Sequence, residues 1–101
     1  MNRAGIDIPK DAVAAFCRKH YIRKLAFFGS VLRDDFQPGS DIDVLVEFDP
    51  MRPVGLIRLA GIQRELSAVL GRPVDLSTEG FLSPYFRDEV LREAEIHYVA
   101  P

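Results

Sequence analysis

The chain has 101 residues, of which 48% are hydrophobic, and this length predicts a single domain over residues 1–101 with a modest core. Its net charge of −2 gives no general attraction to nucleic-acid phosphates, so we expect no direct binding of DNA or RNA. One cysteine excludes an internal disulfide, and the absence of an 18-residue apolar run or a signal peptide predicts a cytoplasmic protein outside the membrane.

The first helix is predicted to open at Ile8-Pro9, with Asp7 as a candidate cap and Pro9 tolerated in the first turn. Apolar and aromatic residues then recur at intervals of three and four, which predicts one inward-facing stripe. Its members are Val13, Phe16, Cys17 and His20. Cys17 is therefore expected to be a small core residue, and His20 a residue at the C-terminal end of the helix, favoured there by the helix dipole.

A short buried strand is predicted over residues 25–28, followed by a bend at Gly29-Ser30. A glycine there lets the backbone approach a phosphate closely, and the Ser30 hydroxyl and the next amides can donate hydrogen bonds to its oxygens, more so if Val31 opens a helical turn. The bend alone would be an ordinary turn, so its significance depends on the acidic residues that follow it.

Asp41 and Asp43 open the next predicted strand, and the apolar run over residues 44–46 anchors that strand in a core. Successive strand residues point to opposite faces, so these two carboxylates project together on one side. Like charges held this close favour a bound cation, and oxygen ligands favour Mg²⁺. Glu47 has the same parity but lies about 13 Å from Asp43 along an extended strand, so it is not expected to be a ligand.

The segment between these two strands is predicted to be a loop over residues 34–40, with Phe36 reaching back into the core. Arg33 has two interpretations: its guanidinium clamps a triphosphate, or it is a solvated side chain paired with Asp34 or Asp35. If the strands form an antiparallel pair, the Gly29-Ser30 bend and the two aspartates lie at the same edge of the sheet.

A second helix is predicted over residues 56–70, stopped by Gly71 and Pro73. Gly61 inside it costs about 1 kcal/mol relative to alanine, which points to a close helix contact or a partner. The strand that follows, residues 73–77, is expected to be central, and its only ionisable group is Asp75. Asp75 is either part of the acid cluster or a plain strand-end aspartate.

The last helix is predicted to start at Ser83-Pro84, with Ser83 as its cap. Apolar residues spaced by four are expected to face the sheet. They are Leu82, Phe86, Val90 and Ala94. The charged residues between them form a predicted solvated face, and residues 96–99 alternate as a terminal edge strand with His97 outward.

Taken together, these residues resemble a known family. One pattern is similar to the signature of the DNA polymerase β-type nucleotidyltransferase superfamily. It consists of Gly29-Ser30, a spacer of ten residues, and Asp41-x-Asp43. The short length resembles its minimal nucleotidyltransferase (MNT) branch, the antitoxins paired with HEPN toxins. The resemblance covers about residues 10–99 and implies an α/β (α+β) fold, a small mixed sheet with helices packed on it as in the polymerase β palm core.

Two further segments carry the same resemblance. Arg33 and Asp35-Phe36 stand where such proteins carry the pattern GSxxRxDF, and Val74-Asp75-Leu76 is similar to the strand that holds the family's third carboxylate. The resemblance therefore implies that Asp75 joins Asp41 and Asp43 as a catalytic and metal-binding residue.

The family implies an enzyme that transfers AMP from ATP to a tyrosine hydroxyl of a HEPN ribonuclease toxin and so acts as an antitoxin. The site would hold Mg²⁺, two ions in our interpretation, on Asp41, Asp43 and Asp75, and the nucleotide on Gly29, Ser30 and Arg33.

Two other functions stay open from the sequence: an antitoxin that neutralises its toxin by binding alone, and a nucleotidyltransferase acting on small molecules as aminoglycoside-modifying relatives do. A domain of this size with little spare core often associates, so we also expect a homodimer or hetero-oligomer.

Overall fold

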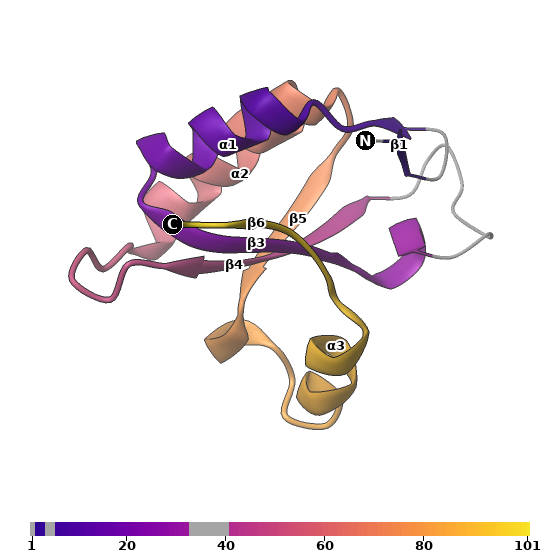
Figure 1. Cartoon of the computed structure of the whole chain (residues 1–101). Coiled ribbons are helices and arrows are strands. Elements are labelled where there is room, and N and C mark those ends of the chain that lie inside the picture. The colour runs from indigo at the N-terminus through magenta and orange to yellow at the C-terminus, as the bar shows by residue number, and fades with distance from the viewer. Residues whose placement is uncertain (1, 4–5, 33–40) are drawn as a thin grey trace.

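A computed structural model of the chain describes residues 2–3, 6–32 and 41–101. Its main feature is a four-stranded sheet in the order β5-β4-β3-β6. The strands are β3 (Ile22–Phe28), β4 (Ile42–Phe48), β5 (Val74–Thr78) and β6 (Glu95–Val99). β3 is antiparallel to β4 and β6, whereas β5 is parallel to β4 (Figure 1). This mixed sheet confirms the predicted fold class.

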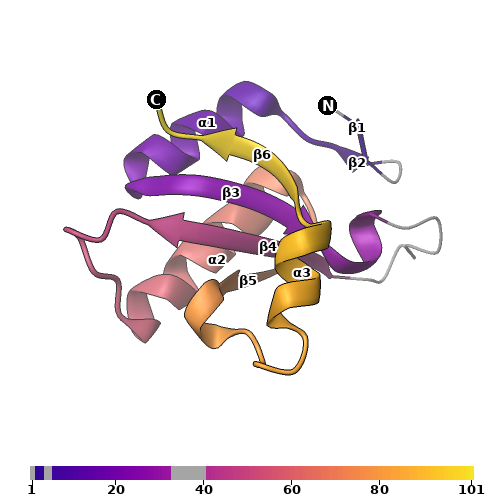
Figure 2. The ribbon, with the colours of Figure 1, turned by 60° about the horizontal axis from the view of Figure 1, so that its bottom comes forward.

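Three helices cover the sheet unequally. α1 (Lys10–Lys19) and α2 (Leu56–Leu70) lie together on one face, where α1 packs on β3 and α2 on β5. α3 (Arg87–Glu93) lies on the opposite side, as the two views show (Figures 1 and 2). The second face, which we call the open face, is therefore covered only in part.

Four short elements complete the described chain. The 3₁₀ turns η1 (Gly29–Leu32) and η2 (Glu79–Phe81) follow β3 and β5. A small antiparallel hairpin of β1 (Asn2–Arg3) and β2 (Ile6–Asp7) precedes α1 and was not predicted, because strands of two residues carry no periodic pattern.

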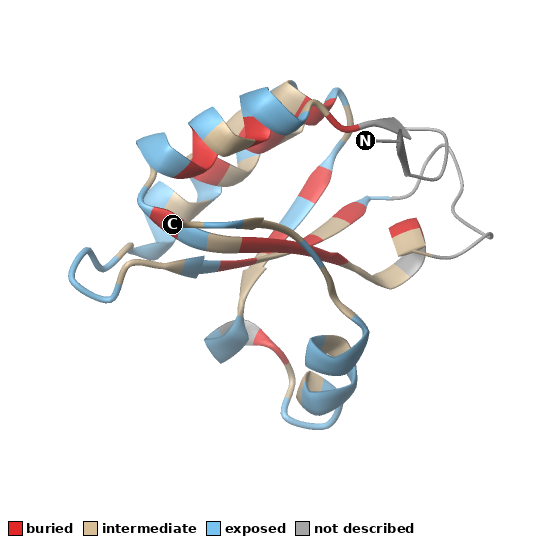
Figure 3. Cartoon of the chain, in the orientation of Figure 1, coloured by how far each residue is buried: buried red, intermediate tan, exposed pale blue. Residues whose placement is uncertain are grey.

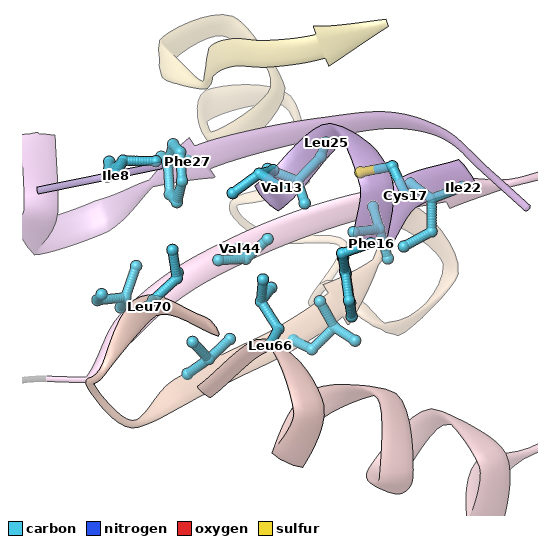
Figure 4. Close-up of a cluster of buried hydrophobic side chains, with 14 of the residues drawn as sticks. Ile8, Val13, Phe16, Cys17, Ile22, Leu25, Phe27, Val44, Leu66 and Leu70 are labelled. Carbon is cyan, nitrogen blue, oxygen red and sulfur yellow. The ribbon is translucent and has the colours of Figure 1, made fainter. Parts of the chain in front are cut away.

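The core lies between the sheet and the pair α1 and α2. Buried residues of β4 alternate with less buried ones, whereas three successive residues of β3 are buried (Figure 3), and the close-up shows side chains of both layers meeting (Figure 4). Val13, Phe16 and Cys17 of α1 belong to this core, as predicted. Burial raises the pKa of the Cys17 thiol to about 12, so the thiol stays protonated and serves as a packing group.

Helix termini differ from the sequence expectations. Asp7 lies in β2, and α1 begins after Pro9 with no side-chain cap. α3 begins at Arg87, later than Ser83, because the Ser83 hydroxyl accepts a hydrogen bond from the amide of Tyr85 and closes a local turn instead. α2, in contrast, has the predicted bounds, and Gly71 ends it with φ 70°.

His97 does not point outward, so this expectation was wrong. Its ring lies 5.5 Å from the ring of Phe27, a core residue, because the pairing of β6 with β3 shifts register between Leu25 and Ala26. Burial lowers the pKa of His97.

None of the helices in the described part of the chain is long and apolar enough to cross a membrane.

Candidate active site

Gly29 and Asp43 are in direct contact at one edge of the open face. Phe28, the last residue of β3, pairs with Asp43 of β4, so the bend after β3 turns against the Asp43 side chain. Gly29 has φ 75°, and a Cβ there would lie 3.2 Å from Cγ of Asp43 and closer still to the carboxylate oxygen Oδ2. Only glycine fits this position without strain or displacement. The bend and the acid thus share one edge, as the antiparallel pairing predicted.

Asp75 lies beside Asp43 on the neighbouring strand. The two residues are register partners in the parallel β4 and β5 ladder, and parallel strands run about 4.8 Å apart. Val74 and Leu76 are buried against the helices, whereas Asp75 between them is exposed; Asp43 likewise lies between buried neighbours. Both carboxylates therefore belong to the open face.

Asp41 stands one residue before β4 and is exposed, whereas Ile42 after it is fully buried. Strand alternation places Asp41 on the same side as Asp43. The amide of Ile42 donates a hydrogen bond of 2.9 Å to the carbonyl of Pro73, which holds the starts of β4 and β5 together. All three aspartates thus lie at or just before the beginning of two adjacent strands.

Gln63 and Ser67 of α2 hold β5 in place, and sequence reasoning missed both. The amide of Leu76 donates to Oε1 of Gln63 at 2.9 Å, and the amide of Val74 donates to Oγ of Ser67 at 3.1 Å. These two amides flank Asp75 on an edge strand, where they would otherwise face solvent. A polar residue within an amphipathic helix gives no distinct signal, because most such residues only face water.

The strand of Asp75 is not central, so the prediction of a central strand was wrong. β5 is the edge of the sheet and Asp75 is exposed, so no desolvation cost forces it to have a charged partner. Its place in the site depends on its register with Asp43 instead.

Within the described ranges, no three His, Cys, Asp or Glu side chains converge closely enough to hold a metal ion by themselves. This is compatible with Mg²⁺, because that ion is usually held by one or two carboxylates together with waters and substrate phosphates. The acids of the site supply the hard oxygen ligands that such an ion prefers.

The remaining predicted residues have three different outcomes. Ser30 follows Gly29 within η1, so its backbone belongs to the bend; Arg33 and Phe36 lie outside the described residues. Glu47 lies near the far end of β4, paired with Lys24, away from Asp43.

The arrangement described above, a glycine bend in contact with one of several carboxylates at the strand ends, is the one expected from the resemblance to nucleotidyltransferases. Residues 10–97 match the family model described as the nucleotidyltransferase domain. The chain is also 38% identical over 76 residues to "Putative protein adenylyltransferase MJ0435" of Methanocaldococcus jannaschii, covering 75% of this chain and 80% of the relative. The chain belongs to the nucleotidyltransferase domain family, and the protein is a nucleotidyltransferase.

Two toxin–antitoxin structures are among the solved structures that share the fold. One is a toxin–antitoxin crystal structure with AMP-PNP, with a TM-score of 0.73 and 18% identity over 90% of this chain and 73% of that chain. The other is a tri-AMPylated Shewanella oneidensis HEPN toxin in complex with an MNT antitoxin, with a TM-score of 0.65 and 18% identity over 90% of this chain and 70% of that chain. At this identity the likeness establishes the fold.

Proposed function

We propose that this enzyme transfers AMP from ATP to a protein hydroxyl, a tyrosine on a cognate HEPN-type toxin, and thereby acts as its antitoxin. The observation that supports this proposal most is the contact between Gly29 and Asp43, with Asp75 in register on the next strand, because the bend to which we assign phosphate binding is then next to paired carboxylates. The names of one relative, a "Putative protein adenylyltransferase", and of one structural neighbour, an MNT antitoxin in complex with a tri-AMPylated HEPN toxin, support the choice of AMP as the transferred group and of a HEPN-type toxin as the partner.

Each residue has a role in this proposal. Gly29 lets the triphosphate approach the backbone, and the amides of η1 together with Ser30 and Arg33 bind its oxygens. Asp41, Asp43 and Asp75 would hold Mg²⁺, two ions in our proposal, and these ions would supply positive charge to neutralise the triphosphate and the departing pyrophosphate. Asp75 also accepts the proton of the attacking hydroxyl.

We assign a protein acceptor because the candidate site is accessible to a second macromolecule. It lies on the partly covered open face of the sheet, where Asp41 and Asp75 are exposed. Another protein can present its own hydroxyl on a folded surface and thus complete the site.

Replacing one carboxylate tests the reaction. Asp43→Asn keeps the shape of the side chain but removes its charge, so we expect AMP transfer to fall by at least about 100-fold. The free energy of unfolding should be unchanged or higher without metal, because two acids on adjacent strands repel each other. The measurement is the mass of the HEPN partner after incubation with the enzyme, ATP and Mg²⁺.

Glu47→Gln is the matched control, since this exposed glutamate lies on the same strand but away from the site. It should transfer AMP like the unaltered chain. Transfer by Asp43→Asn at the normal rate would exclude the proposed chemistry. If Asp43→Asn loses transfer yet still neutralises the toxin in cells, the antitoxin acts by binding alone.

A further inference from the structure

A hollow of about 450 Å³ lies between the Asp43 edge of the open face and the segment that contains α3. We call it the α3 groove. Phe28, Gly29 and Asp43 line it from the sheet side, so it is continuous with the candidate active site. A second hollow of about 250 Å³ lies further along the open face, and none of the predicted site residues lines it. An acceptor that reaches the candidate site near Asp43 would therefore lie next to the α3 groove.

The wall of the α3 groove combines apolar and acidic side chains. Leu82, Phe86 and Val90 provide the apolar part, and Glu89 and Glu93 provide two carboxylates. These glutamates are four residues apart on α3, so they lie on one face of the helix, one turn from each other.

The charge of the α3 groove selects what can enter it. Among its lining residues in the described chain, three are acidic and none is lysine or arginine. The same acids do not converge as a metal site. Glu89 and Glu93 would repel a triphosphate from the α3 side of the groove, which leaves the triphosphate to the Gly29 bend on the sheet side. A cationic or apolar group would be attracted.

The segment around α3 also exposes large aromatic side chains. Phe86 is 54% exposed and Tyr85 is 95% exposed, and α3 itself, seven residues long, has no buried residue. A helix this short gains little stability alone, and exposed aromatic residues beside a cavity are typical of protein interfaces.

We propose that the α3 groove binds the acceptor segment: a positively charged stretch of protein chain that carries the reacting hydroxyl. Lysine or arginine side chains of that segment lie against Glu89 and Glu93, and an apolar side chain packs on Phe86. This proposal rests on the proposed function and adds to it the chemistry by which the acceptor is recognised.

The bound segment would present its hydroxyl at the Asp43 edge. The hydroxyl oxygen forms a bond to the α-phosphorus of ATP. The bond from that phosphorus to the oxygen that joins the α- and β-phosphates breaks. The hydroxyl proton passes to a site carboxylate, and pyrophosphate leaves. The groove itself takes no part in these bond changes; it positions the acceptor.

The test compares two fluorescent peptides of equal length with a central tyrosine, one flanked by two arginines on each side and the other by two glutamates. Fluorescence anisotropy with the full chain should give about tenfold tighter binding of the basic peptide, and the difference should shrink at high salt. The variant Glu89→Lys/Glu93→Lys should lose this preference or reverse it.

The control variant is Asp11→Lys/Asp88→Lys, which changes the net charge by the same amount. Asp11 lies on α1 and Asp88 on α3, both exposed, and neither lines the groove. It should keep most of the preference. Circular dichroism checks that both variants fold.

A second readout, AMP transfer from ATP to the two peptides followed by mass spectrometry, separates the two proposals. A preference for the basic peptide in binding that Glu89→Lys/Glu93→Lys abolishes supports the groove, even if neither peptide gains AMP; in that case only the proposed reaction on such acceptors fails. Equal binding of both peptides, or a preference that both double variants change equally, overturns the groove whatever the transfer assay shows.

Discussion

Gly29 is the residue on which the geometry of the site depends. Its φ of 75° is a conformation that residues with a side chain rarely adopt, and the space where a Cβ would stand is taken by the Asp43 carboxylate. The same glycine thus permits the bend and the close approach of the acid. A phosphate placed at the bend is therefore next to a carboxylate without any rearrangement of the backbone.

We predict that Gly29→Ala loses about 1–2 kcal/mol of unfolding free energy from the left-handed backbone alone. AMP transfer should fall by roughly 100-fold, because either the bend or Asp43 must move by a substantial fraction of an ångström. Urea denaturation and the mass assay measure the two effects. Gly80→Ala is the control, since a Cβ at Gly80 meets nothing within 4 Å; equal effects of both substitutions would contradict this account.

At the scale of elements, Gly61 inside α2 and Gly71 at its C-cap differ in whether the structure requires a glycine there. Gly71 ends the helix in the left-handed conformation, as the sequence predicted. Gly61 was expected to allow a close helix contact or a partner. Within 4 Å, however, a Cβ there would meet only the end of the Arg64 side chain, at 3.8 Å. The structure thus provides no close contact within the described part of this chain that requires Gly61.

Gly61→Ala should therefore raise the free energy of unfolding by about 0.5–1 kcal/mol through helix propensity. Gly71→Ala should lower it by about 1 kcal/mol, because alanine is strained at φ 70°. Urea denaturation of the two variants measures both signs. If Gly61→Ala gains stability but weakens binding to the proposed toxin partner, Gly61 serves an interface. A loss of stability would show that a methyl group at this position does not fit beside Arg64.

At the scale of the whole molecule, α1 and α2 are joined by charged groups at one end of the helix layer. Nζ of Lys19 lies 2.8 Å from Oε1 of Glu65, and Nε2 of His20 lies 2.6 Å from Oε2. The hydrogen bonds from Lys19 and from His20 lower the pKa of Glu65. His20, expected at the C-terminal end of its helix, is indeed its C-cap residue.

The pKa of Glu65 is lower in the folded chain than the ordinary glutamate value of 4.5, so its ionised carboxylate stabilises the fold at pH values above 4.5. This stabilisation is lost as the pH falls through the lower pKa of the folded chain. We therefore expect Glu65→Gln to lose stability at pH 7, by at most about 1 kcal/mol because the pair is partly exposed. The deficit should vanish at acid pH. Urea midpoints between pH 3 and 7 measure it, with Glu47→Gln on the open face as control; a deficit that is the same at every pH would refute the ionic explanation.

Local sequence rules predicted much of this protein. The period of apolar residues predicted the bounds of α2 and the inner face of α1, and the Gly29-Ser30 bend with Asp41 and Asp43 indicated the site from spacing and residue type. These features depend on neighbours a few residues apart, so the sequence contains what determines them. Arg33 and Phe36 stay predictions, since they lie outside the described residues.

The tertiary structure alone decided how distant segments meet. It made β5 an edge strand parallel to β4, put Asp75 in register with Asp43, and tied β5 to α2 through Gln63 and Ser67. It also turned His97 inward through a register shift in β6. Strand order and register result from the packing of the whole core rather than from any one segment, and a shift of one residue would move every side chain to the other face.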